Sequence, residues 1–137
     1  MVLLISLLAC GTLSFAAAAV LQFRLFGWKA LCGLGFVPEE RRALIDARRL
    51  SRRLSALMYA VSAAFFAGAF ALHTHRVSPG TLSRVMIVSL LAAVDLSWFL
   101  YRASDRNEYS AAARASSKRT LLLYNAILLI VLLFIVS

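Results

Sequence analysis

Four stretches of this chain are each long and apolar enough to cross a lipid bilayer as a helix. The hydrocarbon core is crossed by about 20 mostly apolar residues in helical form. The first, second and fourth stretches carry no charged side chain, and the third carries the acid Asp95 and begins at Arg84. Apolar residues fill 62% of the 137 positions. Soluble proteins have roughly 45–50%, and lipid is the solvent that accepts the excess. We therefore predict a single membrane domain, an all-α integral membrane four-helix bundle with spans at about residues 1–23, 54–73, 84–101 and 120–137.

The first apolar stretch is expected to remain in the protein as a helix. It has no basic segment before its apolar run, and apolar sequence continues through Leu21. Both features differ from a cleaved secretory leader. The residues before Cys10 therefore resemble a lipidation box only superficially.

Basic residues are shared unevenly among the loops that join the spans. Loop 24–53 holds eight Lys and Arg, residues 74–84 from the outer turn to the start of the third span hold two, and loop 102–119 holds five. Because cytoplasmic loops carry the excess of Lys and Arg, loops 24–53 and 102–119 are expected in the cytoplasm and both termini outside it. The net charge of +9 would suggest nucleic acid in a soluble protein. Beside apolar spans, the positive charge instead indicates loops that orient the protein in the membrane and contact anionic headgroups. We therefore expect no nucleic acid partner.

A run of arginines precedes the second span and has two interpretations. Each basic residue near the membrane surface contributes about 1 kcal/mol of attraction to acidic lipid, which makes headgroup contact the simpler one. Glu39, Glu40 and Asp46 interrupt the positive charge, so a docking surface for a partner protein stays open. The candidate contact residues are Arg41, Arg42, Arg48, Arg49, Arg52 and Arg53.

The segment from Pro38 is expected to begin a cytoplasmic helix that leads into the second span. Proline suits the first helical turn, and the acids after it favour the positive end of a helix. The helical pattern then runs through Leu44 and Leu50. Arg42 and Asp46 are four residues apart and are expected to pair on its surface, for about 0.2–0.5 kcal/mol.

Asp95 is the most expensive side chain to place, because an acid at the centre of a span costs roughly 2.5–3.5 kcal/mol. Counted inward from the cytoplasmic face, Tyr59, Tyr124 and Asn125 reach about the same depth on other spans. We predict an intramembrane polar cluster of Asp95, Tyr59, Tyr124 and Asn125. Its function is either structural, with Asp95 bonded to Tyr59, Asn125 or a neighbouring subunit, or that of a proton, ion or substrate site.

Small residues in the first two spans are expected to let helices approach closely. Four alanines stand together at 16–19, and the second span has small residues at 60, 63, 64, 67 and 68. Ala64 and Gly68 have the four-residue spacing of a helix-packing motif.

No residue pattern indicates catalysis or a bound group. Cys10 and Cys32 form no CxxC pair, and His73 and His75 lack a third metal ligand nearby. Hydrolase serine motifs, phosphate loops and paired carboxylates are missing from the sequence. We therefore expect no enzyme, no cofactor and no metal.

The segment between the first two spans resembles the DUF3784 family of small bacterial membrane proteins of unknown function. That family similarly has a span, a Gly-aromatic segment, a charged stretch with an aspartate, and a second span. The similarity runs over roughly residues 29–60 and is carried by Gly33-Leu34, Glu39-Glu40-Arg41, Asp46 and Leu50. It implies a bacterial inner membrane origin and no particular activity.

These features together favour a small non-enzymatic protein of the inner (plasma) membrane. We expect an accessory or assembly subunit of a larger membrane complex, or a homo-oligomer, with anionic lipids and a membrane protein as partners. The alternative is a minimal oligomeric transporter or channel that uses Asp95 as its intramembrane acid.

Overall fold

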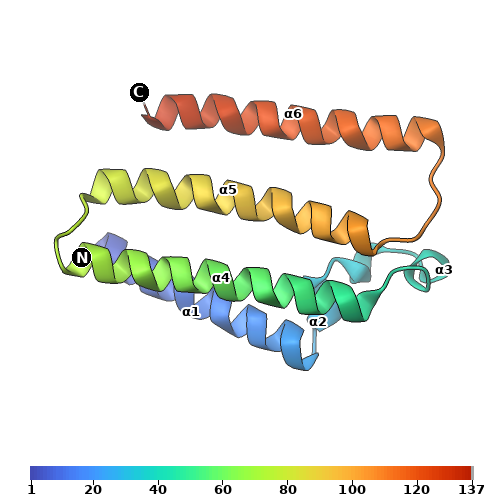
Figure 1. Cartoon of the computed structure of the whole chain (residues 1–137), viewed down its shortest axis with the longest axis horizontal. Coiled ribbons are helices and arrows are strands. Elements are labelled where there is room, and N and C mark those ends of the chain that lie inside the picture. Colours follow the sequence, from blue (N-terminus) through green and yellow to red (C-terminus); the bar gives the residue numbers. More distant parts are fainter. Residues whose placement is uncertain (137) are drawn as a thin grey trace. The chain divides into compact units, whose positions relative to one another are not determined.

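The computed structural model describes the backbone of residues 1–136 and their side chains apart from those of 132, 135 and 136. Every regular element among them is a helix (Figure 1), which confirms the predicted all-α class. Two compact units divide the chain, Met1–Arg106 and Asn107–Ser137. Ser137, the last residue of the fourth predicted span, lies outside the described residues.

Three long helices form the first unit, with three short ones between the first and second of them. The long helices are α1 (Val2–Phe23), α4 (Ala47–His73) and α5 (Pro79–Ser104), and the short ones are α2 (Trp28–Leu31), η1 (Leu34–Phe36) and α3 (Glu39–Arg42). Each long helix is apolar and long enough to cross a membrane. The first three predicted spans fall within them, apart from Met1.

The ends of the long helices follow from local chemistry. The Asp46 carboxylate accepts the Arg49 N–H at 3.1 Å and so caps the start of α4. Ser78 caps α5 in the same way through the Thr81 N–H, with Pro79 at the first helical position. Helix α1 ends where Arg24 takes a left-handed conformation, with φ of 50°.

The helix predicted to run from Pro38 into the second span is interrupted. Helix α3 makes one turn, residues 43–46 are not helical, and α4 begins at Ala47. The expected pairing of Arg42 with Asp46 is replaced by other bonds. The Arg42 Nη2 donates to the Val37 carbonyl at 3.0 Å, while the Asp46 carboxylate caps α4.

Backbone pairing with the end of α5 accounts for this break. The Asp46 N–H donates to the Ser104 carbonyl at 2.9 Å, and the Arg106 N–H donates to the Leu44 carbonyl at 3.1 Å. Ile45 and Asp105 form an isolated antiparallel bridge between these bonds. Residues 44–46 pair with residues 104–106 and cannot also be helical, so this pairing divides α3 from α4.

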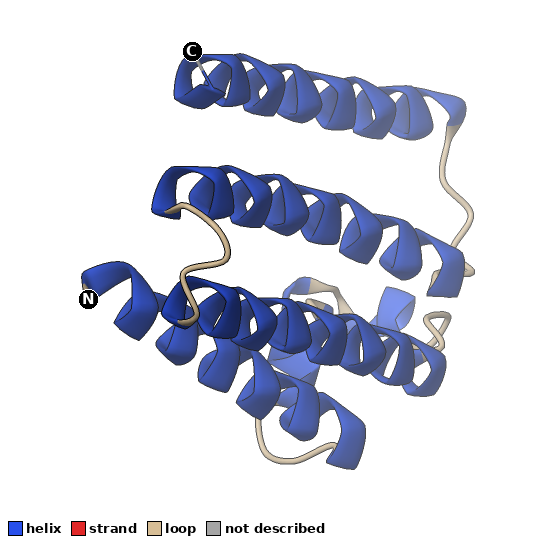
Figure 2. Ribbon diagram, turned by 60° about the vertical axis from the view of Figure 1, so that its left-hand side comes forward, coloured by secondary structure: helices blue, strands red, loops and turns tan. Residues whose placement is uncertain are grey.

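Helix α4 is the centre of the first unit. It runs antiparallel to α1 and to α5 and packs against both (Figures 1 and 2). Two apolar clusters hold the three helices, one at each end. The cluster at the turn between α4 and α5 consists of Leu7, Phe65, Ala69 and Leu82, and the cluster under the short helices consists of Leu21, Cys32, Leu34, Ile45, Leu50 and Leu54.

The second unit consists of a short extended segment and helix α6 (Ala111–Val136). The Ser110 hydroxyl accepts the Ala113 N–H at 3.2 Å at the start of the helix. Helix α6 contains residues 120–136 of the fourth predicted span, and its crossing of the membrane stays a prediction.

Candidate functional site

Two buried serines of α4 bond to the backbone of α1. The Ser55 hydroxyl donates to the Ala18 carbonyl at 2.9 Å, and the Ser62 hydroxyl donates to the Gly11 carbonyl at 2.8 Å. Ser55 and Ser62 are two helical turns apart on α4, and their partners are two turns apart on α1, so each set lies on one face of its helix. In lipid, such bonds hold helices together because the alternative is an unsatisfied polar group.

Small residues permit this close approach, although only some of those predicted take part. Ala18 is fully buried, and an added Cβ at Gly11 would lie 3.1 Å from the Phe66 ring. Gly68 is buried against Met86 of α5. The alanines at 16, 60, 63 and 67 are exposed.

Tyr59 faces α1. Its hydroxyl donates to Gln22 Oε1 at 2.6 Å, and its ring meets the Phe15 ring edge-on, with centroids 5.4 Å apart. Helical side chains lean toward the N-terminus of their own helix, so Tyr59 and Gln22 lean toward each other on antiparallel helices. The hydrogen-bond partner of Tyr59 is therefore Gln22 and not Asp95.

Asp95 lies on the side of α5 away from the residues that face the other two long helices. Ala93 and Ser97 line a pocket with residues of α1 and α4, and each is about 200° around the helix from Asp95. The Asp95 Oδ1 is buried and has no hydrogen-bond partner among the described residues. Within Met1–Arg106, Asp95 and Tyr59 therefore do not form one bonded cluster.

The other two members of the predicted cluster belong to the second unit. Tyr124 and Asn125 lie on α6, in the half that follows its basic residues. Their association with Asp95 stays a prediction.

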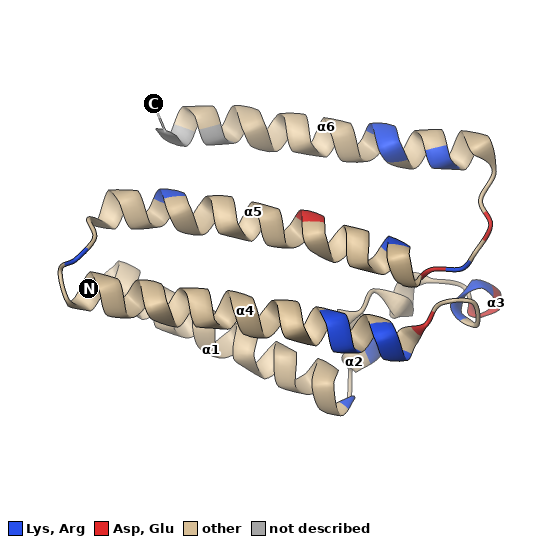
Figure 3. Ribbon diagram, in the orientation of Figure 1, with Lys and Arg blue, Asp and Glu red and all other residues tan. Residues whose placement is uncertain are grey.

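The six arginines that precede the second span occupy two helices. Arg41 and Arg42 lie on α3, and the other four lie in the first two turns of α4 (Figure 3). The first turn of α4 contains no acid. Arg48 and Arg49 therefore stand in the first turn, where the helix dipole is positive, and the Asp46 carboxylate that caps α4 offsets part of the resulting repulsion.

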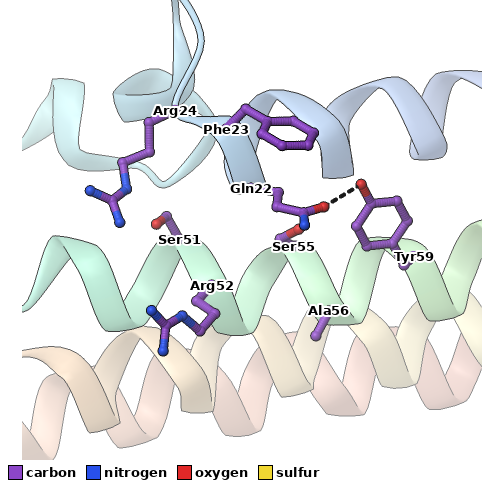
Figure 4. Close-up of a pocket in the computed structure, with 8 residues that line it drawn as sticks. All are labelled: Gln22, Phe23, Arg24, Ser51, Arg52, Ser55, Ala56 and Tyr59. Atoms are coloured by element: carbon purple, nitrogen blue, oxygen red, sulfur yellow. Dashed lines mark hydrogen bonds between the residues drawn. The ribbon is translucent and has the colours of Figure 1, made fainter.

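A pocket of about 490 Å³ lies between the end of α1 and the start of α4 (Figure 4). Its floor holds the buried Ser51 and Ser55, and its rim holds the exposed Arg24 and Arg52. The remaining lining residues are Gln22, Phe23, Ala56 and Tyr59. The pocket thus combines two cations with an apolar wall.

The segment between α1 and α4 folds over a small core that encloses Cys32. Only 3% of Cys32 is exposed, and burial raises the pKa of its thiol to about 11. Phe26 and Phe36 of the same segment are almost fully exposed. Aromatic rings in that position suit the headgroup layer of a membrane.

We expect maleimide to label Cys32 slowly in the folded protein at pH 8, in a Cys10→Ser background. The thiolate is the reacting species, so labelling should accelerate only as pH approaches 11. The raised pKa contributes stability that is complete below the ordinary thiol pKa and is lost as pH rises through about 11. Labelling in denaturing detergent is the control. Equal rates in the folded and denatured protein at pH 8 would contradict the burial of Cys32.

No cluster of three or more His, Cys, Asp or Glu that could hold a metal ion occurs among the described residues. Comparison of the chain with family models, curated proteins and solved structures finds no match. The resemblance to the DUF3784 family over residues 29–60 therefore stays a prediction.

Several residues of these sites were not predicted from the sequence. Gln22 and Arg24 stand at the end of the first span, and Ser55 and Ser62 stand seven residues apart within the second. Polar residues at this spacing on one helix face are a detectable signal for a polar seam. Their partners on α1, which are backbone carbonyls, leave no trace in the sequence.

Proposed function

We propose that this protein is a non-enzymatic subunit of a membrane assembly, bound to a larger membrane protein or to further copies of itself. The unpartnered Asp95 carboxylate carries the proposal. Three buried side-chain atoms lack a partner among the described residues, namely Arg42 Nε, Asp95 Oδ1 and Ser104 Oγ. Arg42 lies on α3 and Ser104 is the last residue of the candidate span of α5, whereas Asp95 lies inside that span, nine residues before its end.

A carboxylate within hydrocarbon requires a donor, and such residues usually face another helix or a water-filled cavity. The packed faces of α1, α4 and α5 do not supply that donor, because Asp95 points away from them. A donor on a helix of a partner subunit would satisfy it, with Asn125 of α6 as the candidate within the chain. The large apolar side chains exposed on α1, among them Leu13 and Phe15, add surface for lipid or for a partner.

We place the protein in the inner (plasma) membrane with both termini outside the cytoplasm. Thirteen of the 15 Lys and Arg lie in loops 24–53 and 102–119, the eight and five counted above. A C-terminal fusion to a phosphatase that folds only outside the cytoplasm is expected to be active, and a fusion to green fluorescent protein dark. If the phosphatase is active when fused after residue 53 and inactive at the C-terminus, the orientation is the opposite of the one proposed.

The alternative function is transport or conduction by an oligomer that uses Asp95 as its intramembrane acid. The same unpartnered carboxylate favours it, since ionisable groups in spans also mark ion and proton pathways. One acid without a neighbouring histidine or second acid makes a poor relay, so assembly is the preferred function.

Extraction in mild detergent followed by mass spectrometry distinguishes the two. A stoichiometric larger membrane protein supports the accessory role, and a homo-oligomer without flux in liposomes supports self-assembly. Proton-coupled flux by a purified homo-oligomer would replace the assembly function with transport.

A further inference from the structure

We propose that the pocket between the end of α1 and the start of α4 binds the phosphate group of an anionic phospholipid. The proposal rests on the membrane insertion of α1 and α4 proposed above, but not on the presence of a protein partner. It assigns a ligand to Arg24, Arg52 and Gln22, which the packing of the first unit does not use fully.

Arg24 and Arg52 form the polar end of the pocket, and no acidic residue lines it. The guanidinium groups of Arg24 and Arg52 come from different helices and lie at the same end of the view, on either side of Ser51 (Figure 4). None of the eight residues that line the pocket is acidic. Like charges around one pocket repel each other, and an anion between them removes that cost. Arginine suits this task because its planar donors match phosphate oxygens.

Gln22 supplies further donors. The Tyr59 hydroxyl donates to Gln22 Oε1, which fixes the amide and leaves its two N–H donors for another acceptor. The floor serines supply none, because the hydroxyls of Ser51 and Ser55 already donate to the carbonyls of Arg48 and Ala18. The donors available to a ligand thus come from the rim.

The backbone of Arg24 is strained where its side chain enters the pocket. Its φ of 50° lies in the left-handed region, where glycine is the usual residue at a helix C-terminus. The Leu25 N–H bonds to the Val20 carbonyl at 3.0 Å and closes this turn. Glycine would form this turn at lower cost, so the turn alone does not call for the Arg24 side chain.

The position of the pocket selects a lipid as the source of the phosphate. Helix α1 ends at Phe23 and the uncharged part of α4 begins at Leu54, so the pocket straddles the boundary between span and loop. The arginines lie at the level of headgroups, and Phe23 and Ala56 form an apolar wall toward the span. A volume of about 490 Å³ is within the range of ordinary ligand sites.

The test uses the full chain, purified in a neutral detergent and stripped of lipid. Its thermal unfolding midpoint is titrated with phosphatidylglycerol, with phosphatidylcholine of the same chains, and with millimolar inorganic phosphate. We expect phosphatidylglycerol to raise the midpoint well above the other two. Arg24→Gly and Arg52→Gln should each weaken the apparent affinity for phosphatidylglycerol about tenfold, the loss expected for one charged hydrogen-bonding partner.

Two features of the variants keep the result decisive. Glycine prefers the conformation of residue 24, so Arg24→Gly removes the charge without disturbing the turn. Arg49→Gln is the matched control, because it removes the same charge from an exposed position of α4 outside the pocket. It should change the affinity less than twofold.

Three outcomes overturn the proposal. Equal shifts with phosphatidylglycerol and phosphatidylcholine would show that the phosphate site does not select anionic lipid. An equal loss in Arg49→Gln and Arg52→Gln would reduce the effect to general charge. A full shift with inorganic phosphate alone would make the site one for free phosphate.

Discussion

Replacing Gly11 by leucine is expected to destabilise the pair of α1 and α4 more than any other single change proposed for this protein. A Cβ at Gly11 would already lie 3.1 Å from Phe66 Cε1 and 3.3 Å from Phe65 Cβ. The Phe65 Cβ is fixed to the backbone of α4, so the helices must separate to admit a larger side chain. Overpacking of this kind costs about 1–3 kcal/mol.

Separation of the helices also breaks the bond from Ser62 to the Gly11 carbonyl. Ser62 is 2% exposed, and its hydroxyl has that one acceptor. Loss of a buried partner costs about 1–3 kcal/mol, so the sum is on the order of 2–6 kcal/mol in the free energy of unfolding. Unfolding by a graded mixture of mild and denaturing detergent, followed by circular dichroism, measures this quantity.

Gly80→Leu is the matched control for Gly11→Leu. Gly80 lies in the first turn of α5, and a Cβ added there meets nothing within 4 Å. The stability of this variant should be unchanged or slightly raised, because leucine is the better helix former. Similar losses in both variants would mean that the α1–α4 seam is not where the first unit is held together.

Asp95→Leu is expected to abolish the association of the protein with its assembly partner while leaving the isolated protein at least as stable. Within the first unit the carboxylate gains no bond, and its removal relieves an insertion cost of roughly 2.5–3.5 kcal/mol. In the assembly, the donor that pairs with Asp95 would be left unsatisfied. Copurification in mild detergent measures the association, and detergent unfolding measures the stability.

Two further variants serve as a graded substitution and as a control for Asp95→Leu. Asp95→Asn keeps the size of the side chain and one acceptor, so it should retain part of the association. Thr12→Val is the control, because Thr12 is exposed within a span and bonds only to the Leu8 carbonyl of its own helix. Association that survives Asp95→Leu intact would remove the assembly function proposed from this residue. A loss of stability in the isolated protein would instead mean that Asp95 holds the chain's own helices together.

The long helices of the first unit were predictable because span length and hydropathy are properties of the sequence read in one dimension. The predicted second span ends with α4 at His73, and the first ends with α1 at Phe23. The break before Ala47 was not predictable, because the local pattern through Leu44 and Leu50 is helical. Backbone bonds from residues 44–46 to the end of α5 override it.

The predicted polar cluster shows the same limit. Counting residues from one membrane face estimates the depth of Tyr59 and Asp95, but it does not give the direction in which each side chain points around its helix. Rotation of the helices turned Tyr59 toward Gln22 of α1 and Asp95 away from the packed faces. Depth was a property of each span alone, whereas direction depended on how the spans pack.

The sequence by itself determined that this protein is helical, that lipid is the solvent suited to its long helices, and where its positive charge gathers. Composition, run length and the order of charges along the chain are sufficient for these conclusions. Only the tertiary structure decided that Ser55 and Ser62 bond to α1 and that Arg24 and Arg52 line one pocket. Those pairings depend on the rotation and register of two helices, which arise from packing between segments far apart in the chain.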